Sequence, residues 1–140
     1  MNKRIAYTVA LLLLNGCVSQ WPRGSYNELP RAADSEAVTN SISECASYLV
    51  PNHAMVSLDS GPDALSMLMP EALSRQGLQA NPAGIPLTYI VASTGTDSRA
   101  RENEGAFIRV TTPRGTCSQY FTRDTNGVLQ NAGPVMVVLK

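Results

Sequence analysis

The chain has 140 residues with eleven basic and eleven acidic side chains, so its formal net charge is zero. It therefore lacks the excess of positive charge that binds nucleic acid, and we expect no direct nucleic-acid partner. Aromatic residues make up only 6% of the chain, so a core must be built from aliphatic side chains, and the length fits a single domain.

The N-terminal sixteen residues have the anatomy of an export signal. Lys3-Arg4 is followed by the apolar run Ile5–Leu14, which is ten residues long and too short to span a bilayer as a stable helix. The sequence Leu14-Asn15-Gly16-Cys17 then resembles the lipobox of bacterial lipoproteins. This resemblance implies cleavage before Cys17 and acylation of its thiol and amino group, the alternative being a cysteine placed there by chance.

Acyl chains on Cys17 would anchor the mature protein to a membrane, because each buried CH₂ contributes about 0.8 kcal/mol and more than one chain gives lasting attachment. Val18 is not the aspartate that typically retains lipoproteins at the inner membrane, so the family rule implies the outer membrane, with the protein facing the periplasm. We expect a signal peptide at 1–16, a lipidated flexible tether at 17–33 and a single periplasmic domain at 34–140.

The tether shows no periodicity and is interrupted by Pro22 and Pro30. Its large apolar side chains are Trp21, Tyr26 and Leu29. They either pack incidentally on the domain or form a short segment that docks on a partner, since aromatic anchors are enriched at interface hot spots.

Two helices are predicted in the first half of the domain. The first begins at Asp34 or Ser35, repeats apolar residues at helical spacing and is ended by Pro51. The second follows the Ser60–Asp63 turn and carries Leu65, Leu68, Met69, Ala72 and Leu73 at helical spacing, with Gly77 as its C-terminal cap. Pro70 falls off this apolar stripe, so we expect it on the outer face of a kinked helix.

Strands are predicted before and after the second helix. They cover 54–58, 87–92, 106–112, 116–121 and 135–139, with a hairpin turn at Pro113-Arg114-Gly115 and a further turn at Asn126-Gly127. The polar segment 93–104 reads as a solvated hairpin loop. The order indicates an α+β fold, with two helices packed on one face of a small, mainly antiparallel sheet.

Two cysteines remain after lipidation, Cys45 in the first helix and Cys117 in a late strand. A lone pair in an oxidising periplasm is often a disulfide, whereas two buried thiols would act as small apolar residues. Spacing alone does not decide between these two alternatives, because a bridge requires the Cα atoms to come within bonding range.

Residue types that carry chemistry are sparse. His53 is the only histidine and falls in a loop, where surface placement is the usual explanation, and no cluster of His and Cys suggests a metal site. Asp59 and Asp63 flank a turn and suit helix capping better than calcium binding. We therefore expect no catalytic residues, no metal and no cofactor.

The layout resembles the TrbH family of conjugal-transfer lipoproteins over residues 35–134. The similarity is carried by the lipobox, Tyr48-Leu49-Val50-Pro51, Gly61-Pro62-Asp63-Ala64-Leu65, Leu73-Ser74-Arg75-Gln76-Gly77-Leu78, Gly84–Val91, Phe107–Thr111, Tyr120-Phe121 and Asn131-Ala132-Gly133-Pro134. These motifs consist of a hydrophobic pattern interrupted by Gly and Pro residues at turns, and they contain no catalytic signature. The family's members often carry few cysteines, so the resemblance does not support the Cys45–Cys117 pair.

The resemblance implies a structural role in the mating-pair-formation apparatus of conjugation, a type IV secretion system. Its partners would be the membrane, through acyl chains on Cys17, and outer-membrane core subunits of the secretion channel, with homo-oligomers as a further expectation. The competing hypothesis is a periplasmic inhibitor or immunity lipoprotein that blocks a wall hydrolase or toxin through the 93–104 loop.

Overall fold

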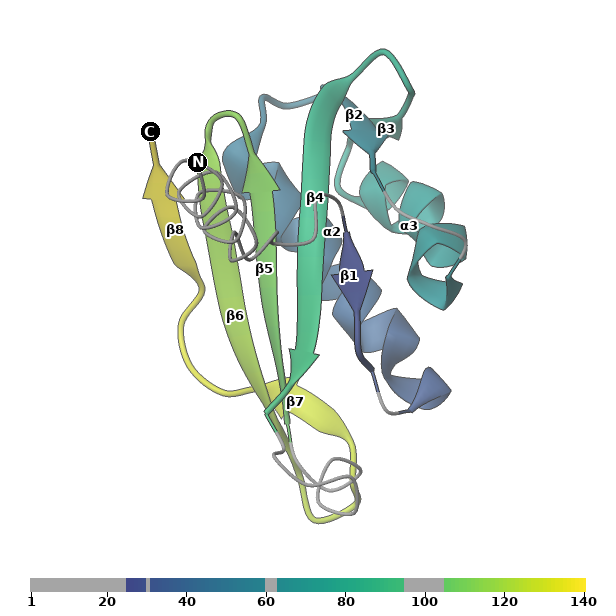
Figure 1. Cartoon of the computed structure of the whole chain (residues 1–140), viewed down its shortest axis with the longest axis vertical. Coiled ribbons are helices and arrows are strands. Elements are labelled where there is room, and N and C mark those ends of the chain that lie inside the picture. Colours follow the sequence, from purple (N-terminus) through teal and green to yellow (C-terminus); the bar gives the residue numbers. More distant parts are fainter. Residues whose placement is uncertain (1–24, 30, 60–62, 95–104) are drawn as a thin grey trace, which may run out of the picture.

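The computed structural model describes residues 25–29, 31–59, 63–94 and 105–140. Two helices lie on one side of a curled, mixed eight-stranded sheet (Figure 1). The predicted α+β class and the helix–strand–helix–strands order are confirmed, but the sheet is larger than the small sheet we expected. The elements are β1 Tyr26–Asn27, η2 Ala32–Asp34, α2 Ser35–Leu49, β2 Met55–Leu58, α3 Ala64–Arg75, β3 Gln79–Ala80, β4 Ile85–Ser93, β5 Ala106–Thr112, β6 Gly115–Arg123, β7 Leu129–Asn131 and β8 Met136–Leu139.

Three long antiparallel strands, β4, β5 and β6, form the centre of the sheet. The free side of β4 pairs in parallel with β2 along its first half and with β1 along its second half. The free side of β6 pairs antiparallel with β8 along its first half and with β7 along its second half. Short strands therefore border both sides of the three-stranded centre, and β3 extends the sheet beyond β2.

The core lies between the two helices and one face of the central strands. Alternate residues of β4 and β5, together with Cys117 and Phe121 of β6, point into this core, as the two-residue period of a strand requires. α2 and α3 each add a buried stripe at helical spacing. Its fully buried members include Val38, Ile42, Cys45, Leu49, Leu65, Met69, Leu73, Leu87, Tyr89, Val91, Ile108, Val110 and Cys117. Each large aliphatic side chain buried here stabilises the fold by about 1.5–3 kcal/mol.

Helix α3 begins as predicted at Asp63, which closes a capping box. The Ser66 backbone N–H donates to Asp63 Oδ1 at 2.7 Å, and the Asp63 backbone N–H donates to Ser66 Oγ at 3.1 Å. Pro70 lies inside α3 and is exposed, so the prediction that it occupies the outer face is confirmed.

The predicted tether is wrong for the part that the structure describes. Tyr26 and Asn27 form β1 beside Ile90 and Val91 of β4, and residues 32–34 form the 3-10 turn η2. The sequence did not indicate this, because a two-residue strand has no periodicity of its own and its partner strand lies far along the chain. The domain therefore starts at least eight residues earlier than position 34, at Tyr26.

Candidate functional site

The structure describes only some of the residues that the sequence predicted to anchor the chain or to contact a partner. Cys17 and Trp21 lie outside the described residues, and for Tyr26 only the backbone, in β1, is described. Leu29 is half-buried and packs against the core, and its backbone N–H donates to Asn27 Oδ1 at 2.9 Å. Leu29 therefore contributes to packing on the domain, which is the first of the two alternatives for the tether.

The two remaining cysteines form a disulfide between α2 and β6. The Cys45 and Cys117 sulfur atoms are 2.00 Å apart, and the Cα atoms are 5.5 Å apart. Both residues are at most 1% exposed, so the bridge lies within the core and fixes α2 against the middle of the sheet. Neither sulfur is a free thiol, so neither can act as a nucleophile while the bridge is intact.

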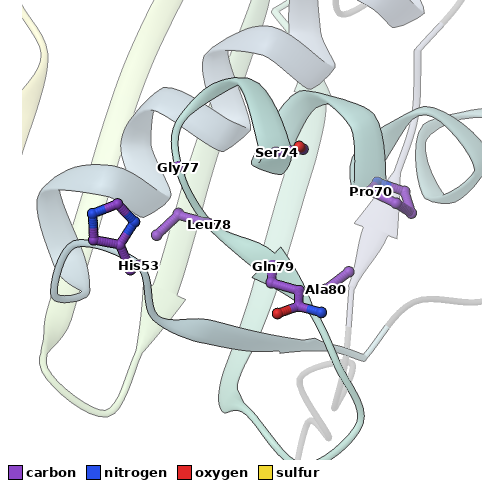
Figure 2. A pocket seen from close by; sticks show the side chains of 7 residues that line it. All are labelled: His53, Pro70, Ser74, Gly77, Leu78, Gln79 and Ala80. Carbon is purple, nitrogen blue, oxygen red and sulfur yellow. The ribbon is translucent and has the colours of Figure 1, made fainter.

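A hollow of about 530 Å³ lies between the second half of α3, β3 and the turn that follows α2 (Figure 2). His53 lies at its rim in a left-handed backbone conformation, with φ of 62°, because the Ala54 N–H donates to the Pro51 carbonyl at 3.2 Å and closes a tight turn. The lining residues are His53, Pro70, Ser74, Gly77, Leu78, Gln79 and Ala80.

The hollow offers hydrogen-bonding groups but little acid–base chemistry. His53 is the one titratable side chain in its lining, and it has no carboxylate or basic neighbour there. Within the described ranges, no three His, Cys, Asp or Glu side chains are grouped so that they could hold a metal ion. The arrangement could accept a hydrogen-bonding ligand, and it does not define a reaction.

Sequence analysis missed a buried ion pair that joins the start of α2 to the end of β6. Arg123 Nη2 lies 2.8 Å from Asp34 Oδ2, and Arg123 Nη1 donates to Asp34 Oδ1 and to the Gly127 carbonyl, both at 3.1 Å. The Arg123 and Asp34 side chains are only 4% and 7% exposed. Asp34 is the residue before α2 but makes no side-chain cap bond to the helix, because its carboxylate is engaged in the ion pair.

A second buried polar contact connects the same two elements. Ser41 Oγ of α2 donates to Gln119 Oε1 of β6 at 2.8 Å, and Gln119 is only 2% exposed. Together with the disulfide and the ion pair, this contact gives α2 three specific links to the last long strand.

On the outer side of α2, the Tyr48 hydroxyl donates to Glu44 at 3.1 Å, and this hydrogen bond and the negative charge of Glu44 raise the pKa of Tyr48.

The most exposed apolar segment among the described residues is strand β8, and we call residues Met136–Leu139 the β8 edge. All four side chains are exposed, by 46%, 40%, 64% and 65% along the strand. The neighbouring face of the sheet away from the helices carries Phe107 and Tyr120, whose ring centres are 4.8 Å apart, and the Arg109 guanidinium, 5.5 Å from the Phe107 centre. Exposed apolar surface of this kind marks interaction sites.

Comparisons with protein-family models, with curated proteins and with solved structures find no match to this chain. In the part of the chain that the structure describes, no helix combines the length and the apolar character needed to cross a membrane. The candidate site is therefore defined by geometry alone, and it is the β8 edge.

Proposed function

We propose that this chain is an outer-membrane-anchored structural lipoprotein of a conjugative type IV secretion complex, the mating-pair-formation apparatus. The observation that carries the anchor is Leu14-Asn15-Gly16-Cys17 directly after a short apolar run. The observation behind the secretion complex is the resemblance of residues 35–134 to the TrbH family. Its periplasmic domain would act by packing against channel subunits, with no reaction of its own.

Two features of the structure support this proposal. The buried Cys45–Cys117 bridge suits an oxidising compartment such as the periplasm. The β8 edge supplies apolar surface and unpaired backbone groups for contact with another protein. A structural subunit needs such a surface.

Replacing Cys17 tests the anchor. In the Cys17→Ser variant we expect loss of palmitate labelling and an uncleaved or soluble precursor, because serine provides no thiol for the acyl chains. The Cys45–Cys117 bridge should still form, as seen by its mobility shift on reduction, which shows that the domain still folds. Palmitate labelling at the unaltered level would disprove lipidation at Cys17.

The proposed partners are tested by a detergent pull-down of the tagged, lipidated chain from its host, followed by mass spectrometry. We expect outer-membrane core subunits of a type IV secretion system in the retained fraction. The Cys17→Ser chain is the control, because it should lose partners that are met only at the membrane. Recovery of one soluble hydrolase or toxin in their place would favour the inhibitor hypothesis and direct attention to residues 93–104.

A further inference from the structure

We propose that the β8 edge is a pairing site for a second copy of this chain. Two copies would join β8 to β8 antiparallel about a two-fold axis, so that their sheets become continuous. The orientation and register follow from the backbone. That the occupant is a second copy depends in part on the proposed lipid anchor, as argued below.

The outer side of β8 has unpaired backbone groups at two residues. The Lys140 N–H donates to the Arg114 carbonyl at 2.9 Å, so this pair is a hydrogen-bonded position of the β6–β8 ladder. Antiparallel ladders alternate, so Met136 and Val138 also direct their N–H and C=O groups at β6. Val137 and Leu139 then direct theirs outward, and no strand of the described chain pairs with that side.

The other border strands of the sheet carry the features that normally block such pairing. β1 and β3 are two residues long, β3 is followed by Pro82, and β7 has three residues and is followed by Gly133-Pro134. Very short strands and nearby prolines protect sheet edges. The β8 edge has four consecutive apolar residues without a charge, a proline or a bulge, so it is the border strand best suited to accept another strand.

An antiparallel arrangement of two copies about a two-fold axis gives every outward backbone N–H and C=O group of Val137 and Leu139 a hydrogen-bond partner. With Val138 opposite Val138 of the second copy, Val137 of each chain pairs with Leu139 of the other, and the outward backbone groups form four hydrogen bonds. The side chains of Val137 and Leu139 then contact each other on one face, and the two Val138 side chains contact on the other. The same four apolar residues supply both halves, so the edge is complementary to itself.

The charges near β8 also favour this orientation. Arg114 and Lys140 lie together at one end of the strand, whereas residues 129–135 at its other end carry no charge. A parallel pair of strands would bring the basic ends of both copies together. The antiparallel pair places each Lys140 beside Met136 of the other copy and separates the positive charges.

The small size of the contact indicates where pairing would occur. Four strand residues span about 14 Å, and such an edge buries far less than the roughly 800 Å² per partner of a stable interface. Copies in dilute solution would therefore associate weakly. Copies held by acyl chains in one membrane meet at a high effective concentration, which favours a second copy over a freely diffusing partner. This step rests on the proposed function.

Cysteine cross-linking in the full-length lipidated chain tests the pairing. In the Val138→Cys variant the two introduced thiols lie on opposed residues, with Cα atoms about 4.5 Å apart, within disulfide range. In the matched Val137→Cys variant they are offset by two residues along the strands, about 8 Å apart and beyond that range. After mild oxidation of membranes we expect about tenfold more disulfide-linked dimer for Val138→Cys than for Val137→Cys.

A charged variant provides the second measurement. Val138→Lys should lower the association of fluorescently tagged copies in the same membranes, measured by energy transfer between the tags, because two lysines would oppose each other across the two-fold axis. The matched control is Thr122→Lys. Thr122 is exposed on the same face of the sheet as Val138 but lies beside β7, so this variant should leave the dimer unchanged. Absent cross-linking at 138, equal cross-linking at 137 and 138, or a dimer that tolerates Val138→Lys would overturn the proposal.

The two proposals can fail separately. Palmitate labelling of the same membranes reports the anchor, whatever the cross-linking result. Labelled protein without a Val138→Cys dimer would refute the pairing and leave the anchor intact. A Val138→Cys dimer in concentrated, unlabelled protein would refute the anchor and establish the pairing.

Discussion

Reduction of the Cys45–Cys117 bridge is expected to lower the free energy of unfolding by about 4 kcal/mol, because the cross-link closes a loop with a sequence separation of 72 residues. Removing it restores conformational entropy to the unfolded chain, and the cost grows slowly with loop length. Since a domain of this size has about 5–15 kcal/mol of total stability, this loss is a large share of it.

Urea unfolding with and without reductant measures this effect. For a small protein with a slope of about 1–3 kcal/mol per molar urea, the transition midpoint should fall by at least about 1 M on reduction. Reduction changes no side chain other than the sulfurs, so it isolates the cross-link from packing. The Cys45→Ala, Cys117→Ala double variant is the control, and its midpoint should not respond to reductant. Equal midpoints for the oxidised and reduced protein would contradict the prediction.

Local sequence pattern was sufficient for the helices and for the central hairpin. α3 is specified by an apolar stripe at helical spacing, by Asp63 at its start and by Gly77 after its end, and all three signals lie within sixteen residues. β5 alternates between buried and more exposed residues along its length and is joined to β6 by Pro113-Arg114, so this hairpin too is determined locally. Such segments are predictable because the interactions that shape them are close in sequence.

The parts that were missed depend on distant partners. β1 is a strand only because β4, more than sixty residues later, offers it a parallel edge. Asp34 and Arg123 are 89 residues apart, and Ser41 and Gln119 are 78 residues apart. The spacing of residues within a local segment therefore cannot predict either contact. The apolar character of β8 was evident from the sequence, but its exposure followed only once it was placed at the border of the sheet beside β6.

Replacing Arg123 with methionine is expected to lower the free energy of unfolding by about 3–5 kcal/mol, because it leaves the Asp34 carboxylate buried without its counter-ion. The methionine keeps much of the aliphatic length of arginine, so the loss is mainly electrostatic. It also removes the donor to the Gly127 carbonyl, which loosens the turn between β6 and β7. Chemical denaturation of the otherwise unaltered chain measures the change.

The Asp34→Leu, Arg123→Met double variant separates two contributions to the free energy of unfolding. One is the net contribution of the ion pair, and the other is the cost of burying the Asp34 carboxylate without a counter-ion. Burying two charges is costly, and well-packed apolar replacements of a buried pair are often neutral or stabilising. The double variant should therefore be more stable than Arg123→Met alone, although Asp34 lies at the start of α2 and its charge also interacts favourably with the helix dipole. A control at the exposed Arg75–Glu71 pair, Arg75→Met, should change stability by less than about 1 kcal/mol. If Arg123→Met cost no more than Arg75→Met, the ion pair would not be holding α2 to the sheet.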